Sequence, residues 1–273
     1  MIRRSYIENG LGGQIHLAEA GNPSSVHPTI LLIHQTPRSW DEFREVMTIL
    51  KSDCHLIAMD LPGMGASSSI SNNPTIEDYS KVAEKVVEHF GSEPMTICGH
   101  HTGAAVAIQL AASKSDYVAS LVLSSAPWLN PNIRSERSRK TPIDTTHATR
   151  DGFHLMDYWR QRSPYYPDEV DYMNRFVADA LKAVNPAEGH LAVGQYKMEL
   201  AVPKVTCPVL LVEHMKDPFA IKHTPHLRAD FPHAALEQVS NGQVALEVTA
   251  SKFATILSNW VFRQEKPIKS NLT

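Results

Sequence analysis

The sequence predicts an α/β protein built on a mainly parallel, doubly wound sheet with an inserted helical segment. Short apolar runs, typical of strands buried on both faces, alternate with segments of helical period through most of the chain. One run, residues 95–98, ends in a glycine-bounded turn that opens directly into an Ala-rich helix. Between about residues 128 and 202 the helical patterns continue without a buried strand. Strands that alternate with helices in this way form parallel sheets covered by helices on both faces.

The N-terminal elements are predicted, in order, as a hairpin, a buried strand and a helix. Residues 3–19 alternate polar and apolar side chains around glycines, which favours a hairpin. Residues 29–33 are apolar at nearly every position, as in a central strand. Ser39 is placed to cap the next helix with Glu42 in the capping-box position, and this helix should run to about Leu50.

The next two β-α units follow the same spacing. Residues 54–60 predict a buried strand that leads into a glycine-rich loop. The apolar residues between Ile76 and Phe90 recur with the 3.6-residue period of an amphipathic helix. The helix after the glycine-bounded turn should reach about Ser113, and residues 117–124 predict another strand.

The helical insertion divides the chain into a core of residues 1–127 and 203–273 and an inserted segment of residues 128–202. The apolar pattern of a buried strand is absent from the insertion and returns after it. The strands before and after the insertion are therefore expected to belong to the same sheet. The remaining predicted elements are helices at 153–160 and 170–181 within the insertion, strands at 208–212 and 235–239 after it, and a helix from about 245 to 262.

The composition favours a protein that acts on small molecules. The 26 basic and 29 acidic residues nearly balance, so neither nucleic acid nor an anionic membrane is an expected partner. Cys54, Cys98 and Cys207 form no C-x-x-C pair and are expected to be free thiols. The N-terminus lacks the apolar core of a secretory signal, and no stretch approaches the ~18 apolar residues of a membrane span. We therefore expect a cytoplasmic monomer or homodimer.

The turn at residues 99–103 carries the pattern G-x-Nu-x-G, in which Nu is a nucleophile and the sequence reads Gly-His-His-Thr-Gly. This strand, sharp turn and helix resemble the nucleophile elbow of the α/β-hydrolase family. The resemblance covers nearly the whole chain and implies the α/β-hydrolase fold, with residues 128–202 as a helical cap over the active site. That fold serves many reactions, so the resemblance implies the fold more strongly than the function.

By resemblance, the three triad positions of the family fall on His101, Asp217 and Gln243. The family usually has Ser, Asp or Cys at the first position and His at the third, so an ordinary acyl-enzyme mechanism lacks both of its proton-active partners here. We expect His101 to be a general base, since a histidine side chain has an ordinary pKa of about 6.5. Gln243 would bridge Asp217 and His101 by hydrogen bonds and orient the imidazole ring.

Other roles for His101 remain open. It could attack directly through an acyl-imidazole, or it could fill the nucleophile position of an inactive protein. The favoured function is a cofactor-independent enzyme that acts on a small carbonyl-containing substrate, either by hydrolysis or by proton abstraction of the lyase type. The alternative is a catalytically inactive ligand-binding or receptor-type homologue.

The oxyanion hole of the family is built from backbone, so it can survive these replacements. By resemblance, its two N–H donors come from Thr36 and from Thr102, the latter at a helix N-terminus. Gln35 stands where the family often has Gly, and together with His34 it borders the expected substrate pocket. His34 and His100 are more often structural histidines at such positions.

Several further side chains are candidates for the pocket or for other chemistry. Trp128, His154, Tyr158 and Trp159 would lie beside the pocket if the start of the cap faces inward, or else form the core of the cap. No metal is expected, since the spacing of His34, His101 and His214 matches no metal motif. Ser124 and Ser125 could supply a displaced hydroxyl, but no elbow-like strain is expected there. A basic run at the start of the cap either lies on a solvated loop or attracts an anionic substrate. It consists of Arg134, Arg137, Arg139 and Lys140.

Overall fold

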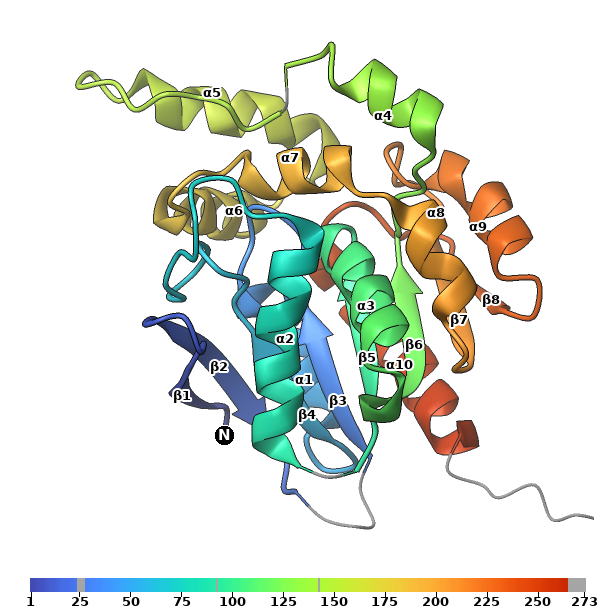
Figure 1. Cartoon of the computed structure of the whole chain (residues 1–273). Coiled ribbons are helices and arrows are strands. Elements are labelled where there is room, and N and C mark those ends of the chain that lie inside the picture. Colours follow the sequence, from blue (N-terminus) through green and yellow to red (C-terminus); the bar gives the residue numbers. More distant parts are fainter. Residues whose placement is uncertain (24–27, 92, 142, 265–273) are drawn as a thin grey trace, which may run out of the picture.

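The computed structural model describes residues 1–23, 28–91, 93–141 and 143–264, and it contains an eight-stranded sheet (Figure 1). The strand order across the sheet is β1-β2-β4-β3-β5-β6-β7-β8. β1 and β2 are antiparallel to each other, β2 is antiparallel to β4, and every other pairing is parallel. The predicted mainly parallel, doubly wound sheet is therefore confirmed. The strands are β1 (Arg3–Glu8), β2 (Gln14–Ala20), β3 (Thr29–Ile33), β4 (His55–Met59), β5 (Met95–His100), β6 (Val118–Ser124), β7 (Val209–His214) and β8 (Ala235–Val239).

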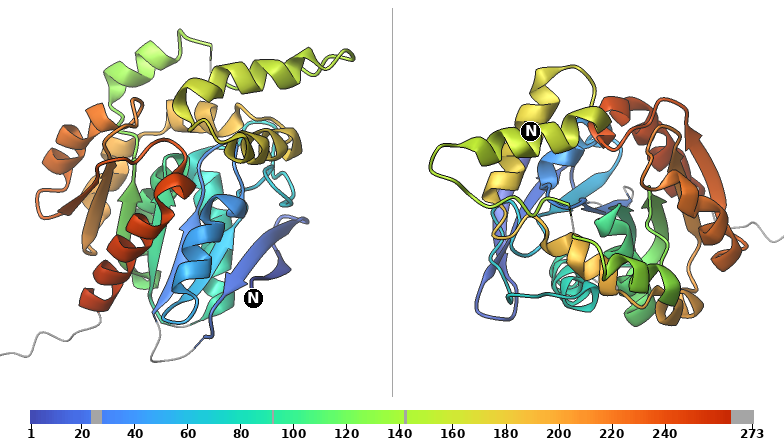
Figure 2. Two further views of the ribbon diagram at one scale, coloured as in Figure 1. Left: turned by 180° about the vertical axis from the view of Figure 1, so that it is seen from behind. Right: turned by 90° about the horizontal axis from the view of Figure 1, so that it is seen from above.

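Helices cover both faces of the sheet, which explains why its central strands are apolar throughout. In β4, Leu56 and Ala58 face one hydrophobic cluster while Ile57 and Met59 face the other, because successive side chains of a strand point to opposite faces. α2 and α3 pack on one face, and α1 and α10 lie on the opposite face (Figures 1 and 2). These helices are α1 (Arg44–Leu50), α2 (Ile76–Phe90), α3 (Thr102–Ser113) and α10 (Ala250–Gln264).

The first helical segment after β3 departs from the prediction. Ser39 does cap it, accepting a hydrogen bond from the Asp41 N–H, but the segment starts as a 3-10 helix, Trp40–Phe43, before α1. Glu42 forms no capping box, because its buried carboxylate accepts hydrogen bonds from the backbone and side chain of Gln35 instead. Glu42 thus holds the loop after β3 instead of completing a helix cap.

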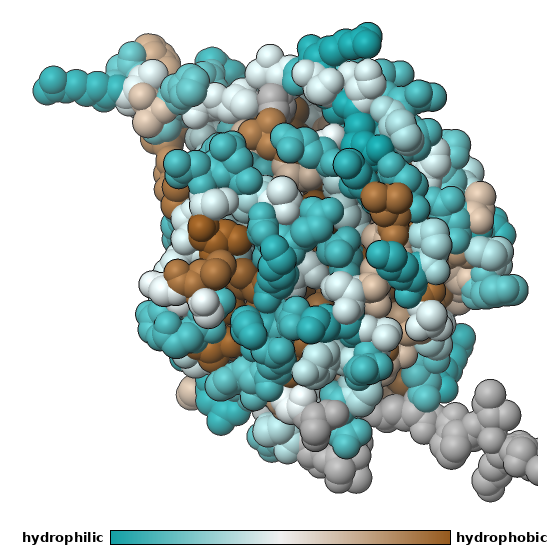
Figure 3. All heavy atoms as spheres, viewed as in Figure 1, coloured by the Kyte–Doolittle hydropathy of each residue, from teal (hydrophilic) through white to brown (hydrophobic). Residues whose placement is uncertain are grey.

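Cap helices lie above the carboxyl ends of the central strands (Figure 1). Their own hydrophobic cluster, formed by Tyr158, Tyr166, Met173, Phe176 and Ala180, meets the core at Ala245. None of the described helices is long and apolar enough to span a membrane. The face in Figure 3 is largely hydrophilic, with apolar side chains in separate patches. The helices of this region are α4 (Pro131–Arg137), α5 (Phe153–Arg162), α6 (Val170–Lys182), α7 (Glu188–Gln195) and α8 (Met198–Ala201), and α9 (Thr224–Asp230) follows β7.

A buried ionic cluster fastens the cap to the core. The guanidinium of Arg38, on the loop after β3, lies 3.0 Å from an Asp179 carboxylate oxygen on α6 and 2.8 Å from one of Glu247. The Ser39 hydroxyl donates a second hydrogen bond to Asp179, at 2.8 Å. Arg38 is completely buried. Buried charges that lose a partner are costly, so this cluster holds α6 in one position above the sheet.

Candidate active site

The elbow at the end of β5 holds His101 in a strained backbone conformation. Its φ is 46° and its ψ is −110°, and L-residues rarely adopt a positive φ. A Cβ added to Gly99 would lie 2.2 Å from the Gly103 carbonyl oxygen, and one added to Gly103 would lie 2.0 Å from the Ile33 carbonyl oxygen. Both glycines are therefore required for the close approach of strand and helix, and together they present His101 at the centre of the sheet's carboxyl edge.

His101 meets a buried carboxylate directly. Its Nε2 lies 2.7 Å from Oδ2 of Asp217, which is fully buried in the loop after β7, although the contact lacks the alignment of a good hydrogen bond. The other oxygen, Oδ1, accepts hydrogen bonds from the backbone N–H groups of Phe219 and Ala220. Burial raises the pKa of Asp217, but His101, Ser125 and His100 together lower it by more, so this pKa lies well below its ordinary value.

Gln243 does not form the expected bridge. No hydrogen bond joins its side chain to Asp217 or His101 among the described residues, and it does not line the cavity beside His101. The imidazole reaches the carboxylate by itself, which leaves no gap for a carboxamide between them. Gln243 follows Gly242, where a Cβ would lie only 2.5 Å from the Nδ1 atom of His214, so the turn is pressed against the end of β7.

The loop after β3 reaches the same place from the other side of the elbow. Gln35 and Thr36 line the cavity together with His101 and Thr102. The Gln35 side chain is held by Glu42 and donates a further hydrogen bond to the Val244 carbonyl, at 2.9 Å. The two residues assigned by resemblance to the oxyanion hole, Thr36 and Thr102, therefore line the same cavity as His101.

His34 supports this loop from below and does not line the pocket, contrary to expectation. Its Nε2 accepts a hydrogen bond from the Leu61 N–H at 2.9 Å, so Nδ1 carries the proton that is donated to the Gln35 carbonyl at 2.7 Å. The ring is fully buried, and burial lowers its pKa. Both nitrogens are occupied by backbone, so His34 is a structural residue.

The cap touches this loop at Thr36. Gly189 on α7 approaches so closely that a Cβ added there would lie 1.9 Å from Oγ1 of Thr36. Thr36 is buried and its hydroxyl has no hydrogen-bond partner among the described residues. The position of Thr36 is therefore set by packing against the cap.

A chain of neutral polar groups lies behind the elbow. His100 Nε2 donates to the Val244 carbonyl at 3.1 Å, so its Nδ1 accepts from the Ser124 hydroxyl at 2.9 Å. The same hydroxyl lies 3.1 Å from Nε2 of His214. Burial lowers the pKa of His100 well below its ordinary value and that of His214 to about 4. No group of three or more His, Cys, Asp or Glu side chains within the described part of the chain could hold a metal ion.

Above His101 lies a cavity of about 610 Å³ between the core and the cap. The volume suits a small organic molecule. Its walls combine apolar and polar groups from both parts of the chain. From the cap and its connections these include Arg137, Lys140, Arg162, His190, Leu191 and Val193. From the segments after β6 and β7 they include Pro127, Phe219, Ala220 and His223.

The four aromatic side chains proposed for the pocket lie elsewhere. Trp128 stacks on His226, with ring centroids 4.0 Å apart, and donates a hydrogen bond to Asp230. The cap helix α5 carries the other three, and none of them lines the cavity: His154, Tyr158 and Trp159. Tyr158 packs in the cap core, as the alternative interpretation held, because α5 turns this face toward α6.

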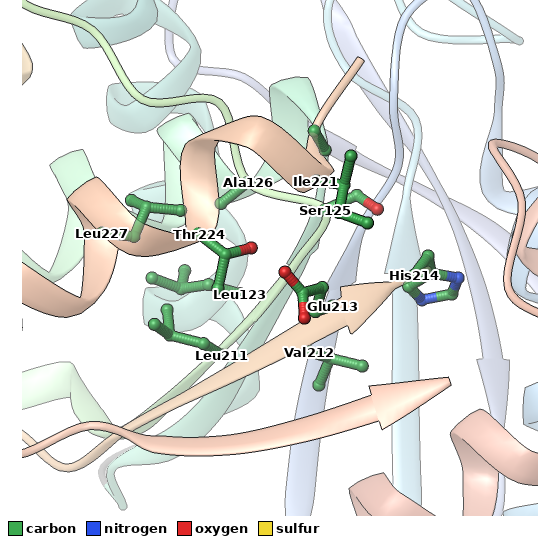
Figure 4. A pocket seen from close by; sticks show the side chains of 11 residues that line it. Leu123, Ser125, Ala126, Leu211, Val212, Glu213, His214, Ile221, Thr224 and Leu227 are labelled. Atoms are coloured by element: carbon green, nitrogen blue, oxygen red, sulfur yellow. The ribbon is translucent and has the colours of Figure 1, made fainter. Parts of the chain in front are cut away.

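Ser125 shares the strain of the elbow, which the sequence did not lead us to expect. It follows β6 with a φ of 46°, is buried, and lines the main cavity. Its hydroxyl lies near enough to Asp217 to lower the pKa of that carboxyl, without the alignment of a hydrogen bond. Ser125 also borders a second cavity of about 10 Å³ between β6, β7 and α9, which has room for about one water molecule (Figure 4).

Residues 28–243 match the sequence profile of the alpha/beta hydrolase fold family. The chain belongs to the α/β-hydrolase family. Among its relatives in that family, the magnesium-chelatase 30 kDa subunit of Rhodobacter capsulatus is 26% identical over 86% of this chain and 87% of its own length. Haloalkane dehalogenase 2 of Mycobacterium tuberculosis is 25% identical over 85% of each chain.

Solved α/β-hydrolases share the fold at lower identity. The enol-lactonase from Burkholderia xenovorans superposes with a TM-score of 0.76 at 17% identity, covering 94% of this chain and all of that one. The family relatives include hydrolases, such as epoxide hydrolases and dehalogenases. In this α/β-hydrolase the glycine-bounded turn carries His101, and the loop after β7 carries Asp217.

The cap supplied the functional candidates that sequence reasoning missed. Arg162 and His190 line the cavity and share the buried carboxylate of Asp144, which lies 3.0 Å from Nε2 of His190. These three residues are separated by 18 and 28 positions along the chain and form no motif. Of the residues that the sequence proposed in this region, two members of the basic run, Arg137 and Lys140, do reach the cavity.

Proposed function

We propose that this α/β-hydrolase hydrolyses a small carbonyl-containing substrate with His101 as general base. The observation that carries the proposal is an imidazole on the elbow, at the floor of the cavity and 2.7 Å from the buried carboxylate of Asp217. A ring nitrogen so close to a carboxylate oxygen carries a proton, because two lone pairs would repel each other. Asp217 thereby favours the Nε2–H tautomer, and Nδ1 keeps the lone pair that a base needs.

The reaction then proceeds in two proton transfers. Nδ1 of His101 removes a proton from a water molecule as its oxygen attacks the substrate carbonyl. The resulting imidazolium gives that proton to the leaving group when the bond from the carbonyl carbon to the leaving group breaks. The lowered pKa of Asp217 keeps this carboxylate ionised at neutral pH, so its negative charge stabilises the imidazolium between the two transfers.

The backbone N–H groups of Thr36 and Thr102 would stabilise the oxyanion of the tetrahedral intermediate. Both residues line the cavity beside His101, and Thr102 opens α3, where the helix dipole adds positive potential. In enzymes with such a site, removal of one donor typically costs about 10²–10³ in kcat. Retention of both positions favours carbonyl chemistry over an unrelated reaction.

The direct test is the turnover of an ester, a lactone and a β-keto acid by wild type and by His101→Ala. We expect His101→Ala to lose about 10²–10⁴ of kcat, the usual contribution of a general base, with an unchanged circular dichroism spectrum. Asp217→Asn should also lose activity, since a carboxamide cannot stabilise the imidazolium by charge. If neither wild type nor His101→Ala turns over any of these substrates while ligands still bind, the protein is a binding homologue and the proposal is wrong. Equal, measurable rates in both proteins would also refute the role of His101.

A second experiment separates the base from a displaced serine nucleophile. A fluorophosphonate reacts covalently with activated serines, and Ser125 is the candidate because it lines the cavity in a strained conformation. We expect intact-mass spectrometry to show no adduct. A stoichiometric adduct on Ser125 that disappears in Ser125→Ala would replace the base mechanism by a rearranged nucleophilic one.

A further inference from the structure

Positive side chains line the active-site cavity without a balancing carboxylate in its wall. Arg137, Lys140 and Arg162 all border it, and no Asp or Glu does so among the described residues. Two buried carboxylates lie behind the lining residues: Asp217 behind His101, and Asp144 behind Arg162 and His190. A cavity lined by one sign of charge concentrates ligands of the opposite sign.

Arg137 is a half-buried cation in this wall whose charge is unmet, whereas Lys140 is exposed to water. It is half-buried at the end of α4, and its guanidinium makes no hydrogen bond or ion pair with any residue that the structure describes. Its neighbour on the same helix, Arg134, instead forms two short hydrogen bonds with Glu199, at 2.6 and 2.5 Å. A guanidinium that is partly withdrawn from water without a partner is unfavourable, so a bound anion would lower this cost.

Arg162 is different, because its charge is already matched inside the protein. Its Nε lies 3.1 Å from Oδ1 of Asp144, a second nitrogen contacts Oδ2, and the guanidinium sits over the Phe176 ring at 5.1 Å. Arg162 therefore shapes the wall, whereas Arg137 can accept a new partner.

His223 supplies a neutral polar group beside Arg137. It is 5% exposed, lines the cavity, and its Nε2 is buried with no hydrogen-bond partner among the described residues. Burial and the positive charge of Arg137 lower its pKa to about 4, so the ring is neutral at pH 7. His223, Arg137 and His101 all line the same cavity. A ligand held by Arg137 and His223 would thus lie near the proposed base.

We infer that the substrate is an anionic carbonyl compound whose carboxylate binds the Arg137 guanidinium, with His223 donating a second hydrogen bond through Nε2. This inference rests on the proposed function, because it places the scissile carbonyl at His101. One unpaired guanidinium matches the single charge and planar fork of a carboxylate. The site would therefore select acids that carry their ester or lactone group at some distance from the carboxylate.

The test compares mono(4-nitrophenyl) succinate, which is anionic, with its neutral methyl ester. For each protein the measured quantity is the ratio of kcat/KM for the anionic substrate to that for the neutral one. Arg137→Gln should lower this ratio about 10- to 100-fold, the range expected for a lost charged hydrogen bond. Arg139→Gln is the matched control, since it removes the same charge from an exposed residue outside the cavity wall, and it should leave the ratio within about twofold of wild type. An equal ratio in all three proteins would overturn the inference.

Direct binding separates this inference from the proposed function. Calorimetric titration of His101→Ala with glutarate should show binding that weakens at least about tenfold when Arg137→Gln is added. Binding of this kind without turnover of any ester by wild type would support the carboxylate site and refute the hydrolytic role of His101. Turnover of both esters without glutarate binding, and without preference for the anionic ester, would refute the carboxylate site and leave the hydrolytic role intact.

Discussion

The substitution Gly103→Ala should destabilise the protein strongly although it adds a single methyl group. The new Cβ would lie 2.0 Å from the Ile33 carbonyl oxygen, 2.6 Å from its carbon and 2.9 Å from the His34 carbonyl oxygen. Ordinary contacts begin at 3.4 Å, so α3 and β3 would have to separate by about 1.4 Å at this point. All three atoms are backbone, and none can rotate away. Overpacking by a methyl typically costs about 1–3 kcal/mol, and a backbone clash at the centre of the sheet should reach or exceed about 3 kcal/mol.

The matched control is Gly194→Ala on α7. A Cβ at Gly194 has no heavy atom within 4 Å, and Ala is favoured over Gly in a helix by about 0.5–1 kcal/mol. The free energy of unfolding, measured in guanidinium chloride by circular dichroism, should therefore fall for Gly103→Ala and rise for Gly194→Ala. A loss of less than about 1 kcal/mol in Gly103→Ala would refute the reasoning. If Gly103→Ala fails to fold while Gly194→Ala remains soluble, the result agrees with the reasoning.

Two further predictions concern the buried ionic groups. Asp179→Asn should lower the free energy of unfolding by about 2 kcal/mol. This is less than the ~3–5 kcal/mol of a fully broken buried pair, because Arg38 keeps Glu247 as a partner. The control is Lys182→Gln, which removes an exposed partner of Asp179 at 4.0 Å, and equal stability of the two variants would contradict the prediction. The pKa of His214 is about 4 in the folded protein and about 6.5 in the unfolded chain. Between these two pH values the unfolded state binds one more proton than the folded state. The free energy of unfolding should therefore fall as pH drops from 6.5 to 4, by up to about 3 kcal/mol. Denaturation at several pH values should show a shallower slope for His214→Gln, and an unchanged slope would assign the acid sensitivity to other groups.

The core could be predicted from the sequence because its signals are local. Apolar runs defined the central strands and an alternating pattern defined the N-terminal hairpin, and β8 begins and ends at the residues that the pattern indicated. The elbow was recognisable from its two glycines, because a Cβ at either position would collide with backbone atoms. Such features depend on a few adjacent residues and on the burial of both sheet faces.

The walls of the site were less predictable because they depend on contacts between distant segments. The direction in which α5 turns its aromatic residues is decided by packing against α6, and the helix itself is short. Glu42 matched a capping box, but a buried amide of Gln35 competes for the same carboxylate. The positive φ of Ser125 follows no glycine or turn signal, so nothing in the sequence distinguished it from an ordinary strand end.

The contact between Gly189 and Thr36 makes the cap and the loop after β3 interdependent in evolution and in engineering. Thr36 occupies the space that any side chain at position 189 would need. A larger residue at 189 therefore requires a smaller one at 36, and the two positions constrain each other although 153 residues separate them. A cap transplanted from another member of the family would preserve the loop only if its helix also left this space empty. Exchange of caps to change specificity should begin with this pair.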